Sequence, residues 1–83
     1  MKLSEVYTPP FRYIEIGRIV DANSKVVFVT TDLYSRAYYK SGKDGIAPAD
    51  RPNIASAFET EIVNLVLDAL NKRVDEESVS GQG

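Results

Sequence analysis

The sequence predicts an α+β fold, in which a small antiparallel sheet of two to four strands packs against one long C-terminal helix. Residues 11–31 are rich in Ile, Val and aromatic side chains, and a turn-like Asp-Ala-Asn-Ser interrupts them. Residues 50–74 repeat apolar side chains at helical spacing. The chain has 83 residues, so we expect a single α+β domain, spanning residues 11–74.

The two ends of the chain are expected to lie outside this domain. Residues 1–10 should form an extended arm, because Pro9 and Pro10 cannot continue a helix. Residues 75–83 are polar and have no apolar period, which is typical of a disordered tail.

A β-hairpin is expected next, with strands over residues 11–20 and 25–31. A three-residue loop, made of a type I turn and a bulge, would let Asp21 pair with Lys25. Glycine is the usual residue at the left-handed position of such a loop, where this chain has Ser24.

Alternation of side chains gives this hairpin two apolar faces. One face should carry Ile14, Ile16, Val20, Val26 and Phe28. The other should carry Phe11, Tyr13, Ile19, Val27 and Val29. A sheet with one wet face would alternate apolar with polar residues, so we expect both faces to be covered.

The segment 33–40 fits either a third strand or a short irregular turn, and we favour a strand over residues 36–40. A Gly-containing loop over residues 41–45 should follow it.

The helix over residues 50–74 has an unusually wide apolar arc. Its main stripe is Ile54, Phe58, Ile62, Leu65 and Ala69, and the side chains that widen it are Val63, Val66, Leu67, Leu70 and Val74. Together they cover roughly 200° of the helix, against the ~100° that one packed surface needs. This helix should therefore contact two partners.

Two over-wide apolar surfaces in so short a chain favour a homo-oligomer. The alternative is that the Tyr-rich segment and the N-terminal arm cover the excess within one chain. We predict an oligomer interface made of Phe58, Ile62, Val63, Val66, Leu67 and Leu70.

Residues 34–43 combine three cations with three tyrosines and carry no acid. Cationic groups neutralise phosphate, and Tyr rings stack on bases. This pattern gives a candidate site for a small anionic ligand at Arg36, Tyr38, Tyr39, Lys40 and Lys43. The alternative is an ordinary surface whose cations are solvated.

Composition restricts the chemistry. Cysteine and histidine are absent, which removes disulfides, thiolate nucleophiles, imidazole bases and the usual zinc ligands. Glu59 and Glu61 point to different helix faces, and residues 41–43 lack the spaced glycines of a phosphate loop. We expect no catalytic residues, no metal and no cofactor.

Charge and hydropathy bear on location and partners. A net charge of −2 argues against general nucleic-acid binding. The sequence has no apolar run that resembles a signal peptide or a membrane span. We therefore expect a cytoplasmic protein that does not enter membranes.

The hairpin Gly17–Val27, followed by the helix start Asn53–Phe58, resembles small phage and prophage accessory proteins, which often pair such a hairpin with one C-terminal helix. The resemblance implies a non-enzymatic role, such as inhibiting or titrating a host factor, and it supplies no site residues.

These observations together predict a non-catalytic protein-interaction module that acts as a homo-oligomer. The alternative function is an oligomeric binder of a small, nucleotide-like anion.

Overall fold

The computed structural model describes residues 1–15 and 17–80. Its elements are α1 (Leu3–Val6), β1 (Arg12–Ile14), β2 (Arg18–Val20), β3 (Val26–Val29), α2 (Thr31–Lys43) and α3 (Arg51–Ser80). The three strands form one antiparallel sheet in the order β1-β2-β3. The predicted α+β class, a small sheet with a long C-terminal helix, is confirmed.

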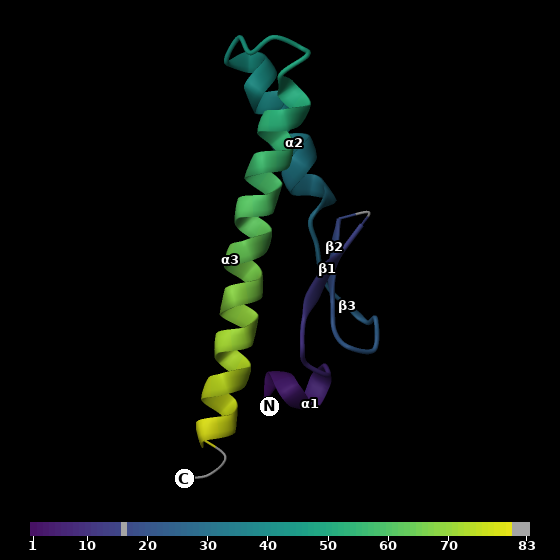
Figure 1. The fold of residues 1–83 in the computed structure, drawn as a ribbon, viewed down its shortest axis with the longest axis vertical. Helices are drawn as coiled ribbons and strands as arrows, with labels where there is room; N and C mark the ends of the chain where they lie inside the picture. Colours follow the sequence, from purple (N-terminus) through teal and green to yellow (C-terminus); the bar gives the residue numbers. More distant parts are fainter. Residues whose placement is uncertain (16, 81–83) are drawn as a thin grey trace.

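Helix α3 runs along almost the whole length of the molecule (Figure 1). Helix α2 packs beside its N-terminal half, and the sheet and α1 lie beside its C-terminal half. The molecule measures 54 × 22 × 16 Å and has a radius of gyration of 15.9 Å. A compact domain of this length has a radius of gyration of about 12 Å. The chain therefore exposes more surface than a compact fold would.

The hairpin loop between β2 and β3 confirms the predicted turn. The amide of Asp21 donates to the carbonyl of Lys25 at 3.0 Å, and Ser24 adopts the left-handed φ of 65°. Val20 pairs with Val26 as expected. The register then shifts, so that Ile19 pairs with Phe28 and not with Val27.

The prediction of one strand over residues 11–20 is wrong, because a turn at Gly17 divides it into β1 and β2. Gly17 has a φ of +65°, which L-residues rarely adopt. A side chain could not be placed there either, since a Cβ on Gly17 would lie 2.6 Å from Cγ2 of Thr31. Ile16, assigned above to a sheet face, lies outside the described residues.

The predicted strand over residues 36–40 is also wrong, because these residues belong to α2. Pairs of residues four apart stabilise the helix: Arg36 Nε lies 2.6 Å from Asp32 Oδ2, and Lys40 Nζ lies 2.5 Å from Asp44 Oδ1. The acid of the first pair lies in the first turn and Lys40 lies in the last, where each complements the helix dipole.

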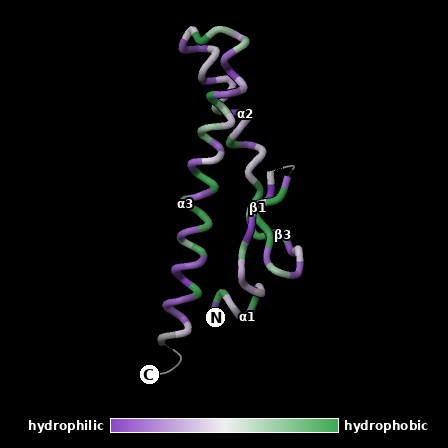
Figure 2. The backbone as a smooth tube through the Cα atoms, in the orientation of Figure 1, coloured by the Kyte–Doolittle hydropathy of each residue, from purple (hydrophilic) through white to green (hydrophobic). Residues whose placement is uncertain are grey.

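The core lies between the sheet and α3. Phe11, Ile19 and Val63 are buried at its centre. The half-buried side chains packed against them are Leu3, Tyr7, Val27, Val66, Leu67, Leu70 and Val74. One predicted sheet face is thus covered in part, through Phe11, Ile19 and Val27, whereas Tyr13 of the same predicted face is 40% exposed. Apolar residues recur along α3 and through the strands (Figure 2).

The opposite face of the sheet is only partly covered. Val20 is fully buried, whereas Val26 and Val29 of β3 are 41% and 54% exposed. The register shift places Val29 on this face and Phe28, which pairs with Ile19, on the α3 side, in contrast to the predicted assignment. The expected cover by α3 is therefore present on one face, and the described residues of the chain only partly cover the other.

Both ends of the chain are more ordered than the sequence predicts. The arm contains α1, and α3 continues through residues 75–80, which were expected to be disordered. Residues 81–83 of that expected tail lie outside the described residues.

Candidate interaction surface

An apolar stripe runs along α3 beside the faces that pack on the sheet and on α2. It consists of Ile54, Phe58, Ile62, Leu65 and Ala69. Ile54, Phe58 and Leu65 are 42%, 41% and 60% exposed, Ala69 is exposed and Ile62 is half-buried. The stripe spans sixteen residues, from Ile54 to Ala69, or roughly 22 Å of helix. Large apolar groups aligned over this length are typical of a contact surface.

The structure divides the six residues predicted to form the oligomer interface. Val63 is buried, and the half-buried Val66, Leu67 and Leu70 pack on the intrachain core. Phe58 and Ile62 remain on the apolar stripe. The stripe residues that the predicted interface omitted are Ile54, Leu65 and Ala69. Their helical spacing was visible in the sequence, but the side of the helix that faces the sheet was not.

A groove between α2 and α3 extends the stripe at its N-terminal end. Its volume is about 440 Å³. Ile46 in the connecting loop, Ile54 and Phe58 on α3, and Arg36 and Lys40 on α2 contribute to its lining. The groove therefore combines apolar walls with two cationic side chains.

The five residues predicted to bind an anion lie on α2. Arg36, Tyr39, Lys40 and Lys43 surround a depression of about 250 Å³, because residues three and four apart share a helix face. Tyr38 lies apart from them and stacks on Tyr34, with ring centroids 6.3 Å apart.

Acids of the same helix reduce the positive charge of this face. Arg36 pairs with Asp32, and that hydrogen bond raises the pKa of Arg36 above its usual value. Lys40 Nζ lies 2.5 Å from Asp44 Oδ1. An incoming anion would have to compete with both carboxylates.

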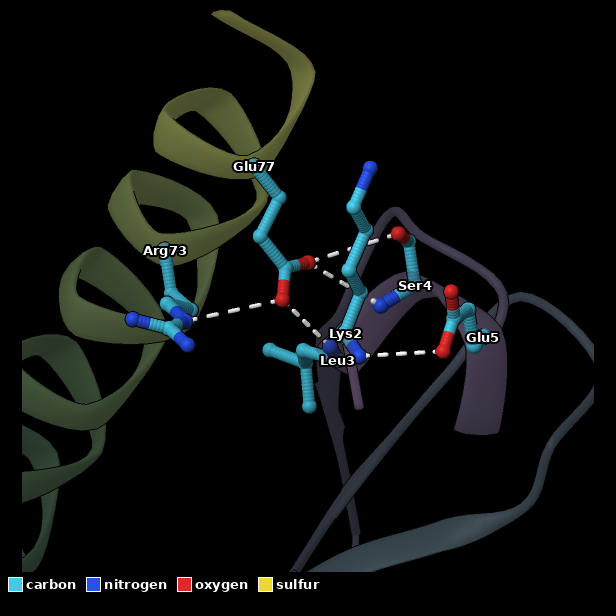
Figure 3. A network of polar contacts seen from close by, with 6 residues as sticks. All are labelled: Lys2, Leu3, Ser4, Glu5, Arg73 and Glu77. Carbon is cyan, nitrogen blue, oxygen red and sulfur yellow. Dashed lines mark hydrogen bonds and ion pairs between the residues drawn. The ribbon is translucent and has the colours of Figure 1, made fainter. Parts of the chain in front are cut away.

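A buried carboxylate joins the two ends of the chain (Figure 3). Glu77 on α3 is only 6% exposed. It accepts hydrogen bonds from the amides of Leu3 and Ser4 at 2.5 and 3.1 Å, and from Ser4 Oγ at 3.3 Å. Arg73 Nε lies 3.5 Å from Glu77 Oε2. This carboxylate holds α1 against the C-terminal turns of α3.

The docking of α1 should depend on pH. Burial raises the pKa of Glu77, but the hydrogen bonds from Leu3 and Ser4 outweigh it, and the net pKa lies below the ordinary value of 4.5. A group whose pKa is lowered on folding stabilises the protein above its unfolded-state pKa, and that contribution is lost as pH falls through the folded-state value. We expect the Leu3 and Ser4 amides to lose hydrogen-exchange protection as the pH falls below 4.5.

Glu77→Gln should lower this protection at neutral pH and remove its dependence on pH. The matched control is Glu76→Gln, because Glu76 is the exposed neighbour on the same helix. Protection factors of both variants, measured between pH 3 and pH 7, check the prediction. Equal protection in Glu77→Gln and the parent chain would contradict it.

The structure shows no centre for metal chemistry: across residues 1–15 and 17–80, no three carboxylates are grouped to hold an ion. Within the same part of the chain, no helix combines the length and apolar character needed to cross a bilayer.

Comparison with known proteins gives no assignment. No family model, no curated protein and no solved structure matches this chain.

Proposed function

We propose that this protein is a non-catalytic interaction module that works as a homo-oligomer, with the apolar stripe of α3 as its contact surface. The observation that carries the proposal is the stripe itself: Leu65 is 60% exposed at its centre, and Phe58 is 41% exposed. Apolar side chains of this size contribute most of the favourable free energy of association when they are buried.

Packing within the chain leaves much of this surface exposed. Helix α2 covers the neighbouring side of α3, where Ala55 is fully buried, and α1 contacts the distant end near Glu77. Phe58 and Leu65 nevertheless remain 41% and 60% exposed. The alternative that other parts of one chain cover the surplus apolar surface therefore loses support.

The elongated shape also supports association. The molecule is only 16 Å across its shortest axis, close to the thickness of two packed elements. A second copy on the stripe would give α3 partners on two sides, as its wide apolar arc requires.

Sedimentation equilibrium over a dilution series tests the proposal. The chain mass is 9.2 kDa, and we expect a species of at least twice this mass that dissociates on dilution. A mass of 9.2 kDa at every concentration up to the millimolar range would contradict the proposal.

Binding of a small anion by α2 is the second candidate function. It is favoured by the depression that Arg36, Tyr39, Lys40 and Lys43 share. Titration with inorganic pyrophosphate and with a nucleoside triphosphate, followed by NMR, would test it. The variant Lys43→Gln should weaken binding if this face holds the anion, and it leaves the apolar stripe intact.

The binding of a host factor, which the resemblance to phage accessory proteins implies, stays a prediction.

A further inference from the structure

An acidic flank borders the apolar stripe on one side. On a helical wheel of about 100° per residue, the stripe lies between the face that packs on the core and the acidic flank. The flank consists of Glu61, Asp68 and Asp75, which are all exposed. They are seven residues apart, so they return to nearly the same side of the helix.

The opposite border of the stripe carries cations. Arg36 of α2 lines the groove beside Phe58. Further along α3, Arg73 lies on the same side of the stripe, and its side chain is 62% exposed. The stripe therefore separates a border with three acids from a border with two arginines. The exposed Lys72 lies between the acids and the stripe, and each arginine also pairs with a carboxylate of its own chain, Arg36 with Asp32 and Arg73 with Glu77.

We infer that a second copy packs on the stripe with its α3 parallel to the first, related by a two-fold axis that runs along the two helices. This inference rests on the proposed function and specifies its partner and geometry. A two-fold axis along the helices turns the second copy so that its acidic flank meets the arginine border of the first. The same contact is repeated on the other side of the pair.

Two ion pairs then form on each side. At the height of Phe58, the acidic flank of one copy brings Glu61 towards Arg36 of the other. Two turns lower, Asp68 faces Arg73 of the other copy, at the spacing by which flanking positions pair in parallel coiled coils. Arg36 can take part although it binds Asp32, because that contact uses only Nε of its five-donor guanidinium.

The antiparallel arrangement has the opposite electrostatics. Its two-fold axis runs across the helices, which keeps both acidic flanks on one side of the pair. Glu61, Asp68 and Asp75 of both copies would then line one edge without the arginines, and like charges at an interface oppose association.

Disulfide trapping tests the orientation, because the chain has no cysteine of its own. A disulfide needs Cα atoms about 4.4–6.8 Å apart. In a parallel pair, Ile62→Cys and Ala69→Cys should each cross-link to itself, since each residue meets its own copy. In an antiparallel pair, only residues next to the two-fold axis lie opposite their own copies. Residues 62 and 69 are roughly 10 Å apart along the helix, so at most one of them could cross-link to itself. Asn71→Cys, on the far side of α3, is the control.

The experiment compares the fraction of cross-linked dimer for each full-length variant at one fixed glutathione redox ratio. Cross-linking of both Ile62→Cys and Ala69→Cys, well above Asn71→Cys, is the expected result. A dimer by sedimentation in which fewer than two stripe positions cross-link would overturn the parallel arrangement and leave the proposed function standing. A monomer at every concentration would overturn both.

A charge exchange gives a second readout that needs no cysteine. Glu61→Arg should raise the dissociation constant about three- to tenfold, because it faces Arg36 of the second copy. Adding Arg36→Glu should restore the affinity to within about twofold. Tighter association of Glu61→Arg alone is the antiparallel result and would overturn the inference.

Discussion

Replacing Leu65 with aspartate should convert the oligomer into a monomer. Leu65 is the most exposed large apolar residue of the stripe, at 60%. In the proposed oligomer the new carboxylate would be buried without a partner, which costs about 3 kcal/mol or more. This corresponds to an increase of about a hundredfold or more in the dissociation constant. Sedimentation equilibrium of the variant at matched concentrations measures the effect.

The fold of the single chain should survive this change, because the Leu65 side chain is largely free of intrachain contacts. The circular dichroism spectrum should therefore remain that of a mainly helical protein. Asn71→Asp is the matched control, since it adds the same charge to an exposed position on the far side of α3. Equal dissociation constants for the two variants would show that the stripe is not the contact surface.

Replacing Gly17 with alanine should cause a large loss of stability. The φ of +65° costs an L-residue about 1–2 kcal/mol. The added Cβ would also meet Cγ2 of Thr31 at 2.6 Å and its backbone nitrogen at 3.0 Å, so the turn and the start of α2 would have to move apart. We expect a total loss of about 2–4 kcal/mol. Urea denaturation at a fixed protein concentration measures it.

Gly45→Ala separates the two contributions. Gly45 also has a positive φ, of +83°, but an added Cβ would meet no atom within 4 Å. Its replacement should therefore cost only the conformational part, about 1–2 kcal/mol. If both alanine variants lost the same stability, the close approach of Gly17 to Thr31 would have no energetic consequence.

Local chemistry made the hairpin predictable from the sequence. The turn composition around Asp21 specified a three-residue loop, and the structure has Ser24 in the left-handed conformation that the loop needs. The carboxylate of Asp21 accepts hydrogen bonds from the amides of Asn23 and Lys25, both at 2.9 Å, within the same loop. These contacts involve neighbours in sequence, so composition is a good guide to them.

Helix α2 was not predicted, because its sequence contains residues that favour a strand as well as pairs that favour a helix. Tyr residues favour strands, and three of the five tyrosines in the chain lie within α2. The helix depends on pairs four residues apart, such as Asp32 with Arg36 and the stacked rings of Tyr34 and Tyr38. Each such pair contributes only about 0.2–0.5 kcal/mol, which a pattern of residue types does not reveal.

The extension of α3 past residue 74 depends on contacts that are distant in sequence. Glu77 is buried because the amides of Leu3 and Ser4 bind it from the other end of the chain. A polar segment with no apolar period gives no sign of such a partner.

The candidate interaction surface was predictable only in part, because it too depends on contacts between residues that are distant in sequence. The wide apolar arc of α3 correctly indicated more apolar surface than one partner covers. Which part faces the core depends on where the sheet docks. The structure assigns Val63 and its neighbours to the core, and leaves Phe58 and Leu65 exposed.

Isotope-filtered NOE spectroscopy tests the central claim, that the apolar stripe of α3 contacts a second copy, most directly. A mixture of ¹³C-labelled and unlabelled chains reports only contacts between copies. We predict NOEs from the methyl groups of Ile62 to the ring of Phe58, and from the methyl groups of Leu65 to the methyl group of Ala69, in the other copy. Intermolecular NOEs confined to the exposed side chains of β3, or none at all, would contradict the claim.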